Sequence, residues 1–204
     1  MPAGKIYIVS TPIGNLGDFT FRAVEVLKSV QLIAAEDTRV SGVLLKHYEI
    51  KTPMLPYHDH NKEQATPGLL RKLEGGDDIA LITDAGTPLV SDPGFFLVRA
   101  AVAQNIDIVP IPGASAMLAA LVAAGLPSDR FTFEGFLPRK KGRQTRFKML
   151  AEDPRTIILY ESPHRVGKTL KDIGEHMGDR QVVIGREITK KFEEFIRGSV
   201  LQVR

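Results

Sequence analysis

Three segments of the chain combine glycine, proline, serine, threonine and aspartate just where an apolar run ends. They are residues 10–18, 83–94 and 110–116. In open α/β sheets, ligands bind beyond the carboxyl ends of the strands, and glycines there let main-chain groups approach a ligand closely. Any one such segment is also typical of a tight turn or a helix cap. Three of them in one chain favour a small-molecule site.

Two aspartates in the second segment have different expected roles. Asp84 follows the end of an apolar run, where its carboxylate can meet the hydroxyls or the ammonium group of a ligand. Asp92 precedes Pro93, an order typical of a helix N-cap and the first helical residue, and it predicts a helix that runs to about Gln104. Spacing alone therefore assigns a ligand-binding role to Asp84 only.

The elements that must position these segments alternate between strands and helices. Buried strands are predicted by six short apolar runs, at residues 6–9, 32–35, 79–82, 106–111, 157–160 and 182–184. Apolar residues at helical spacing between Ala23 and Val30 predict an amphipathic helix, and an alanine-rich helix is expected from near Gly113 to Gly125. The alternation predicts an α/β fold. A turn-rich passage from Leu126 divides it into a domain of residues 1–126 and a second α/β domain of residues 127–204.

Composition excludes several classes of protein. The chain has no cysteine among its 204 residues, so it has no disulfide framework, iron–sulfur cluster or thiol nucleophile. Its longest apolar stretch, residues 114–126, is too short to span a bilayer, and the amino terminus lacks the apolar block of a signal peptide. We therefore predict a cytoplasmic protein with no membrane partner.

Positive charge is concentrated in one segment. Residues 138–148 carry six basic side chains and no carboxylate; they are Arg139, Lys140, Lys141, Arg143, Arg146 and Lys148. The rest of the chain then has 21 basic against 24 acidic residues, so its net charge is negative. A local basic segment is typical of contact with a polyanion, although a solvated loop has the same composition.

Three shorter patterns allow more than one interpretation. Asp37 or Thr38 in the run Glu36–Arg39 can cap a helix or face a substrate. His58-Asp59-His60 has metal-ligand residue types, but a polar loop before a helix is favoured, and we predict no metal site. Gly167-Lys168-Thr169 resembles the end of a phosphate-binding loop, yet the glycine required five residues earlier is Ser162. A helix start at Ser162 would also bury this tripeptide in the second turn.

Seven motifs in order, from about Lys5 to Gly198, resemble the small-subunit ribosomal RNA cytidine 2′-O-methyltransferases, which have the tetrapyrrole methylase fold. The motifs are Thr11-Pro12-Ile13-Gly14-Asn15-Leu16, Glu36-Asp37-Thr38-Arg39, Asp84-Ala85-Gly86-Thr87-Pro88, Ser91-Asp92-Pro93-Gly94, Pro112-Gly113-Ala114-Ser115-Ala116, Glu134-Gly135-Phe136-Leu137-Pro138-Arg139-Lys140 and Tyr160-Glu161-Ser162-Pro163-His164-Arg165.

This resemblance implies a homodimeric enzyme with two α/β domains and S-adenosyl-L-methionine in the cleft between them. Its substrate would be the 2′-hydroxyl of a cytidine ribose in small-subunit ribosomal RNA, within the assembled subunit. A tetrapyrrole or another small molecule as methyl acceptor is the alternative. Carried over by position, the cofactor contacts are Pro12, Ile13, Asp84, Gly86, Thr87, Ser115, Ala116 and Tyr160. Because the family continues past Gly198 with helical sequence, the second domain is expected to be incomplete at its carboxyl end.

A ribose hydroxyl is a poor nucleophile, so the reaction needs a proton acceptor or cationic donors near the developing alkoxide. Asp37 and Glu161 are the candidate acceptors, and Arg39 or Arg165 is the candidate group to hold a phosphate or oxyanion. Spacing does not choose between them. The basic segment is predicted to bind RNA through Arg139, Lys140, Lys141 and Arg143, with Phe136 available to stack on a base and Phe147 assigned to the core.

Overall fold

The computed structural model describes residues 2–203 and confirms the α/β prediction. The chain forms two compact units, Met1–Ser115 and Ala116–Arg204. Helix α5 (Ala116–Ala124) belongs to the second unit, so the units divide at the start of this helix. The domain limits of 1–126 and 127–204 stay a prediction.

The first unit contains a five-stranded parallel sheet in the order β3-β2-β4-β1-β5. Its strands are β1 (Ile6–Val9), β2 (Leu32–Ala35), β3 (Met54–Pro56), β4 (Ile79–Ile82) and β5 (Ile108–Ile111). The predicted strands 6–9, 32–35 and 79–82 are confirmed, whereas the strand expected from residue 106 begins at Ile108. The short edge strand β3, which ends in a proline, was not predicted.

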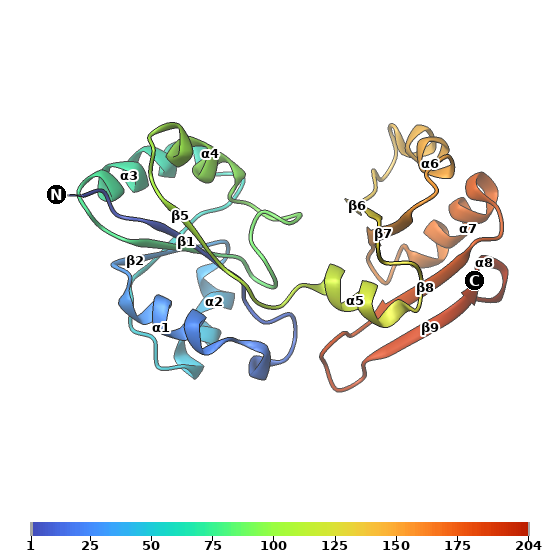
Figure 1. The fold of residues 1–204 in the computed structure, drawn as a ribbon, viewed down its shortest axis with the longest axis horizontal. Coiled ribbons are helices and arrows are strands. Elements are labelled where there is room, and N and C mark those ends of the chain that lie inside the picture. Colours follow the sequence, from blue (N-terminus) through green and yellow to red (C-terminus); the bar gives the residue numbers. More distant parts are fainter. Residues whose placement is uncertain (1, 204) are drawn as a thin grey trace. The chain divides into compact units, whose positions relative to one another are not determined.

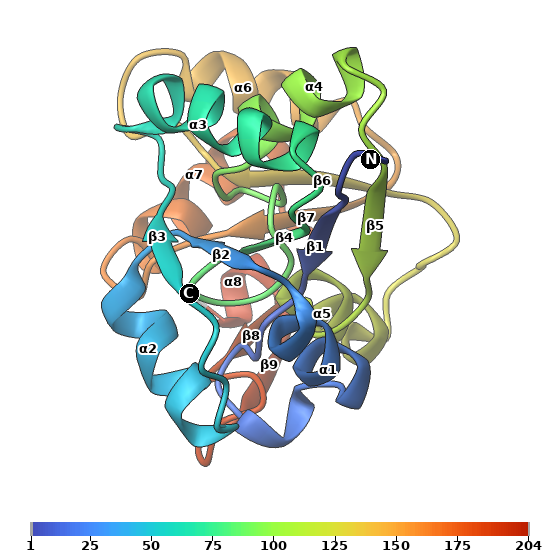
Figure 2. The ribbon, with the colours of Figure 1, turned by 90° about the vertical axis from the view of Figure 1, so that its left-hand side faces the viewer.

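Helices cover both faces of this sheet, which is why its central strands are continuously apolar. They are α1 (Phe21–Ser29), α2 (Thr38–His47), α3 (Lys62–Glu74) and α4 (Phe95–Ala103). Helices α1 and α2 pack on one face and α3 and α4 on the other, as Figures 1 and 2 show. Alternate side chains of each strand supply the two cores, for example Ile33 on the first face and Leu32 on the second. Both faces of the sheet are therefore closed, and its carboxyl edge carries the loops.

The prediction that Asp92 caps α4 is wrong. The helix begins at Phe95, and its N-cap is Gly94, with φ of 132°. A Cβ at residue 94 would lie 2.7 Å from Leu81 Cδ2, so both the backbone angle and the packing require glycine. The chain bends at residues 91–93 before the helix, so Asp92 lies two residues before the N-cap and does not cap α4.

The second unit contains two small sheets, of β6 paired with β7 in parallel and β8 paired with β9 in antiparallel orientation. Its other elements after α5 are β6 (Phe131–Phe136), α6 (Arg143–Ala151), β7 (Thr156–Tyr160), α7 (Val166–Met177), β8 (Gln181–Arg186), β9 (Glu194–Ser199) and α8 (Val200–Val203). Phe147 lies fully buried in the core under α6 and α7, as predicted. Among residues 2–203, no helix is long and apolar enough to cross a membrane.

Helix α7 begins later than expected. A hydrogen-bonded turn starts at Ser162, but the helix itself starts at Val166. Gly167-Lys168-Thr169 therefore lies in the first turn of α7, and the argument that it is buried in a second turn is wrong. The missing glycine at position 162 still separates this sequence from a phosphate-binding loop, and the Thr169 hydroxyl is buried among side chains of its own unit.

Candidate functional site

The three glycine-rich segments converge at the carboxyl edge of the first unit's sheet. Strands β4, β1 and β5 are neighbours and run parallel, so the loops after them meet. Thr11 and Gly86 exchange two main-chain hydrogen bonds, of 2.8 and 3.0 Å, which join the first loop to the second. Beyond this meeting point the two loops lead to opposite faces of the sheet, because α1, which follows β1, and α4, which follows β4, pack on different faces. Ligands bind at such switch points of open sheets.

Side chains fix this convergence further. The Ser10 and Thr87 hydroxyl oxygens are 2.9 Å apart, and Thr87 Oγ1 donates to the Ala114 carbonyl at 3.2 Å. Thr11 Oγ1 donates to the Thr83 carbonyl at 3.0 Å. A Cβ at Gly113 would lie 2.9 Å from Ser10 Cβ, so only glycine lets the third loop approach the first this closely. The three loops thus form one preorganised surface.

Gly86 lies at the centre of that surface. It is buried, its φ is +90°, and a Cβ there would lie 3.4 Å from Ile13 Cγ2 and 3.9 Å from the Ala114 oxygen. Residues predicted to contact the cofactor from the first unit are therefore brought to one place: Pro12, Ile13, Asp84, Gly86, Thr87 and Ser115 are all on these three loops. Main-chain groups around a glycine of positive φ are well suited to contact a nucleoside closely.

Carboxylates gather beside the loops, at the ends of β2 and β4. Glu36 Oε2 accepts hydrogen bonds from Thr83 Oγ1 at 2.5 Å and from the Asp84 amide at 3.3 Å. Asp84 Oδ1 in turn accepts from the Asp37 amide at 3.1 Å. Partial desolvation, and then the negative charge of Glu36, raise the pKa of Asp84. Hydrogen bonds accepted by the Glu36 and Asp84 carboxylates thus connect the carboxyl ends of β2 and β4.

Asp92 is the functional candidate that sequence reasoning missed. Its burial, and next the negative charge of Glu36, raise its pKa to about 6. A carboxyl group with a pKa near neutrality beside a glycine-rich surface is typical of a ligand or catalytic site. The signal was present in Pro93-Gly94, which indicates a turn rather than the first turn of a helix.

Asp37 caps α2, which supports the capping interpretation of this segment. Asp37 Oδ1 accepts from the Arg39 amide at 2.8 Å and from Arg39 Nε at 3.0 Å, while Oδ2 lies 2.6 Å from Arg39 Nη2. Hydrogen bonds from the Arg39 side chain and main chain lower the pKa of Asp37 to about 2. Asp37 thus orients Arg39, whose side chain is 89% exposed.

Glu161 belongs to a polar network of the second unit. Its Oε2 accepts from Thr169 Oγ1 at 2.7 Å, and its Oε1 accepts from the Ser162 amide at 2.8 Å and pairs with Arg165. Burial alone would raise the pKa of Glu161, but hydrogen bonds from Thr169 and Ser162 and the charge of Arg165 outweigh it, so the pKa is lowered. At neutral pH this carboxylate is ionised and fully engaged.

A cavity of about 850 Å³ in the second unit brings together three predicted site residues. Ala116 at the start of α5, Tyr160 at the end of β7 and Glu161 all line it, together with apolar side chains such as Leu121 and Ile184. Its volume lies in the range of small-molecule sites. Ala116 and Tyr160 are therefore placed where a ligand of the second unit can touch them.

Arg143 does not fit the RNA-binding set to which it was assigned. Its side chain is 9% exposed, Nε lies 2.7 Å from Asp172 Oδ2, and Nη2 donates to Thr169 Oγ1 at 2.8 Å. Its guanidinium also lies 5.1 Å from the centre of the Phe147 ring. Because its donors are committed inside the unit, Arg143 is a structural residue, and we remove it from the RNA-contacting set.

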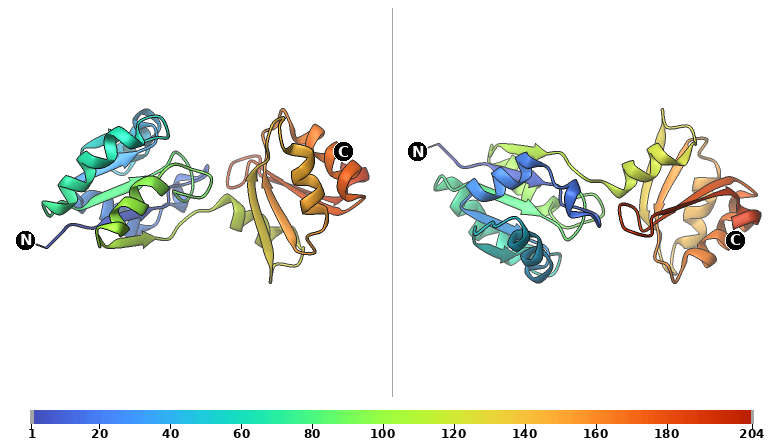
Figure 3. Two further views of the ribbon diagram at one scale, coloured as in Figure 1. Left: turned by 90° about the horizontal axis from the view of Figure 1, so that it is seen from above. Right: turned by 90° about the horizontal axis from the view of Figure 1, so that it is seen from below.

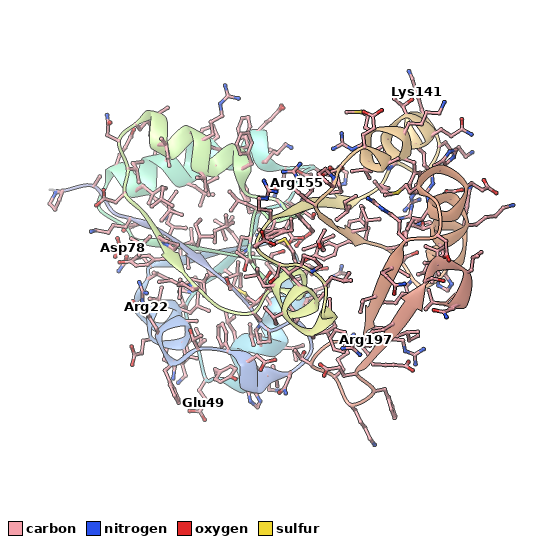
Figure 4. The ribbon with its side chains drawn as sticks, turned by 45° about the vertical axis from the view of Figure 1, so that its right-hand side comes forward. Arg22, Glu49, Asp78, Lys141, Arg155 and Arg197 are labelled. Atoms are coloured by element: carbon pink, nitrogen blue, oxygen red, sulfur yellow. The ribbon has the colours of Figure 1, made fainter. Side chains whose placement is uncertain are left out.

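Arg139, Lys140 and Lys141, in contrast, lie exposed on the loop between β6 and α6. Figure 4 shows Lys141 at the outer edge of its unit, pointing away from the ribbon. Within residues 2–203, none of the three side chains has a carboxylate partner. Phe136, just before the loop, is 57% exposed and packs against Tyr160 with ring centres 5.5 Å apart. An exposed cationic loop with an adjacent aromatic ring results.

The segment His58-Asp59-His60 leads into α3. Asn61 Oδ1 accepts from the His58 amide at 2.9 Å and Lys62 Nζ lies 2.9 Å from Asp59 Oδ1, as in a structured polar turn. In the described part of the chain, no three histidine, aspartate or glutamate side chains are grouped as metal ligands.

Comparison with known proteins places this chain in a family. Residues 5–203 match the family described as Tetrapyrrole (Corrin/Porphyrin) Methylases. A Synechocystis protein named "Ribosomal RNA small subunit methyltransferase I" is 54% identical over 199 residues, which cover 97% of this chain and 71% of the relative. A Pasteurella multocida protein of the same name is 55% identical over 203 residues, covering 98% and 72%.

Solved structures of other methyltransferases have a similar fold. Uroporphyrin-III C-methyltransferase from Thermus thermophilus, solved in complex with S-adenyl homocysteine, matches with a TM-score of 0.67 at 18% identity, over 98% of this chain and 90% of that one. Likeness at this level of identity concerns the fold, whereas the family match covers nearly every residue. The chain therefore belongs to the tetrapyrrole methylase family.

Proposed function

We propose that this protein is an S-adenosyl-L-methionine-dependent methyltransferase that methylates the 2′-hydroxyl of a cytidine ribose in small-subunit ribosomal RNA. The observation that carries this proposal is the close similarity, at 54–55% identity over nearly the whole chain, to relatives named as small-subunit ribosomal RNA methyltransferases. The glycine-rich surface and the separate basic loop match the two needs of such an enzyme, which are a cofactor site and phosphate contacts.

The residues at the glycine-rich surface fit the cofactor. Gly86 leaves open the space that a Cβ would fill between Ile13 and Ala114, and Asp84 lies beside it to accept from ribose hydroxyls or to meet an ammonium group. Pro12, Thr87 and Ser115 complete this set, and Ala116 and Tyr160 are proposed contacts from the second unit. When bound, S-adenosylmethionine supplies an electrophilic methyl group on its sulfonium.

The chain's own residues must orient the acceptor and manage its proton. Arg39, held by Asp37 and largely exposed, is suited to bind a phosphate or a developing alkoxide. Asp37 and Glu161 remain the proposed proton acceptors, but their lowered pKa values make both weak bases. Asp92, with a pKa of about 6, is the strongest base of the three, because its pKa lies closest to neutral pH. The pH dependence of methyl transfer distinguishes them, because ionisation of Asp92 would give an acid limb near pH 6.

RNA binding is assigned to Arg139, Lys140 and Lys141. Three exposed cations on one loop can neutralise successive phosphates, and Phe136 offers a ring beside them. We further propose that the enzyme acts on the assembled small subunit in the cytoplasm, and as a homodimer. The exposed Phe95 and Phe96 of α4 provide aromatic surface of the kind enriched in subunit interfaces.

The cofactor proposal is tested by calorimetric titration with S-adenosylmethionine and S-adenosylhomocysteine, with ATP and magnesium as control. We expect saturable binding of both sulfur ligands and none of ATP. Gly86→Ala should weaken binding by about tenfold, since its Cβ would fill the space between Ile13 and Ala114 and an alanine at φ of +90° strains the loop by roughly 1–2 kcal/mol. Gly76→Ala is the matched control, because Gly76 has a similar φ of +96° before the amino end of β4, away from the loops.

The acceptor is tested by transfer of a labelled methyl group to unmethylated small ribosomal subunits and to uroporphyrinogen. Label in the ribose of a cytidine supports the proposal. Label in the tetrapyrrole alone would establish the alternative acceptor in the same fold. Binding of ATP without binding of either sulfur ligand would overturn the cofactor assignment.

A further inference from the structure

The loop that joins β8 to β9 lies outside the glycine-rich surface and the loop that contains Lys141, although its Ile188 lines the cavity of the second unit. This hairpin loop, residues 187–193, has the sequence Glu-Ile-Thr-Lys-Lys-Phe-Glu and lies at the opposite end of the β8–β9 ribbon from α8 (Figures 1 and 3). It contains an exposed aromatic ring, two lysines and strained backbone within seven residues.

Phe192 and Lys191 form the outward-facing part of the hairpin loop. Phe192 is 68% exposed, so its ring contributes little to the core of the unit. Lys191 Nζ lies 5.5 Å from the centre of that ring, within the range of a cation–π contact. The pair therefore presents a flat apolar face and a positive charge side by side.

The carboxylates of the hairpin do not neutralise this charge. Glu187 Oε1 pairs with Lys190 Nζ at 3.2 Å, and Glu193 Oε2 accepts from the Thr189 amide at 2.6 Å. The third carboxylate, Glu194, pairs with Arg186 at 3.0 Å. Across residues 2–203, no carboxylate forms an ion pair with Lys191, so its ammonium is available to an anionic partner.

The backbone holds this pair in a fixed place. Thr189 has a φ of +68° and Glu187 a φ of +50°, and a β-branched residue in the left-handed region is a strained outlier. A Cβ at Gly185 would lie 3.0 Å from both Ile188 and Phe195, so Ile188 packs down onto the ribbon and anchors the loop. Strain of this kind persists where the surrounding structure imposes it, and it is concentrated at ligand-contacting positions.

We propose that the hairpin loop is an RNA-contacting element, in which Phe192 stacks on an unpaired base and Lys191 binds the adjacent phosphate. This inference rests on the proposed function and extends the RNA-binding surface beyond the loop that contains Lys141. An exposed ring beside an unpaired cation matches single-stranded RNA, in which every base has a face for stacking and every link carries a negative charge.

Binding of unmethylated small-subunit ribosomal RNA, followed by fluorescence anisotropy of a labelled transcript, tests the proposal. Phe192→Ala should weaken binding by between about 5- and 150-fold, whereas Phe192→Trp should retain it, because stacking is lost only in the first variant. Lys191→Gln should reduce the dependence of log affinity on log salt by about 0.7, the value for one phosphate on a single strand. Phe21→Ala is the matched control, since Phe21 is 92% exposed on α1 in the other unit.

The possible results separate this inference from the function on which it rests. Wild-type binding with no change in Phe192→Ala would overturn the inference and leave the proposed function intact. If the wild type neither bound nor methylated the RNA, the function itself would fail, and the inference with it. Sedimentation of the wild type and of Phe192→Ala without RNA measures the oligomeric state. If Phe192→Ala dissociated an oligomer that the wild type forms, the loop would be a protein interface and the RNA-binding inference would be overturned.

Discussion

Replacement of Arg143 by methionine should destabilise the second unit strongly while leaving RNA affinity unchanged. Methionine leaves an unbranched apolar side chain beside Phe147 but removes the guanidinium, and with it the charge that pairs with Asp172 at 2.7 Å, the donor to Thr169 and the cation–π contact with Phe147. Removing one partner of a buried ion pair costs about 3–5 kcal/mol, because the other charge is left without compensation. The Asp172 side chain is 16% exposed, so water can partly solvate its unpaired charge, and we expect a loss of about 3 kcal/mol.

Urea unfolding followed by circular dichroism measures this loss. Lys140→Met is the control, because Lys140 is exposed on the same segment and its replacement should change the free energy of unfolding by less than about 0.5 kcal/mol. Adding Asp172→Leu to Arg143→Met should restore much of the stability, since an apolar pair leaves no unpaired charge. An Arg143→Met variant of unchanged stability, with RNA affinity reduced as much as in Lys140→Met, would refute the structural assignment of Arg143.

Three further outcomes are expected. Asp92→Asn should have no effect on stability below pH 4 and should become stabilising relative to the wild type as the pH rises from about 4 through about 6. The raised pKa of Asp92 means that the folded state binds the proton more tightly than the unfolded state does, so the wild type loses stability over this range. Urea midpoints across pH 3–8 measure the difference, and a difference that does not change with pH would contradict this reasoning. Gly94→Ala should lower the free energy of unfolding by roughly 1–3 kcal/mol, because φ is 132° at this residue and an added Cβ would lie 2.7 Å from Leu81 Cδ2. Thermal unfolding measures the loss, and a stabilised variant would disprove the strain. Asp37→Asn should leave any acid limb of the pH–rate profile near pH 6 in place, since a carboxyl group with a pKa of about 2 does not titrate there, whereas disappearance of that limb would identify Asp37 as the base.

Local sequence was sufficient for most of the first unit's sheet. The runs at residues 6–9, 32–35 and 79–82 are buried strands because a parallel sheet covered on both faces needs apolar side chains at successive positions. Helix α5 was predicted for the same kind of reason, from alanines ended by Gly125. The start of α4 was not, because Asp92-Pro93 satisfies a local capping rule that Gly94 and its packing against Leu81 override.

The candidate site was predicted in part. The three loops were recognised because strand-end glycines have a meaning that depends only on local geometry, whereas ligand binding by Asp84 stays a prediction. The raised pKa of Asp92 comes first from its burial in the folded chain and then from Glu36, which is far away in the sequence, so it could not be inferred from spacing. The cation–π pair of Lys191 and Phe192 is local, but its exposure is a property of the folded hairpin.

By itself, the sequence determined the alternation of strands and helices, the family motifs and the position of the basic segment, because these follow from residue type and short-range spacing. The tertiary structure decided which of the charges remain available. Arg143 and Lys141 are two residues apart in the same basic segment, yet Asp172 and Thr169, more than 25 residues further along, bury the first while the second stays in water. Whether a charge meets solvent or a partner depends on which distant side chains folding brings to it, and that information is not contained in a local pattern.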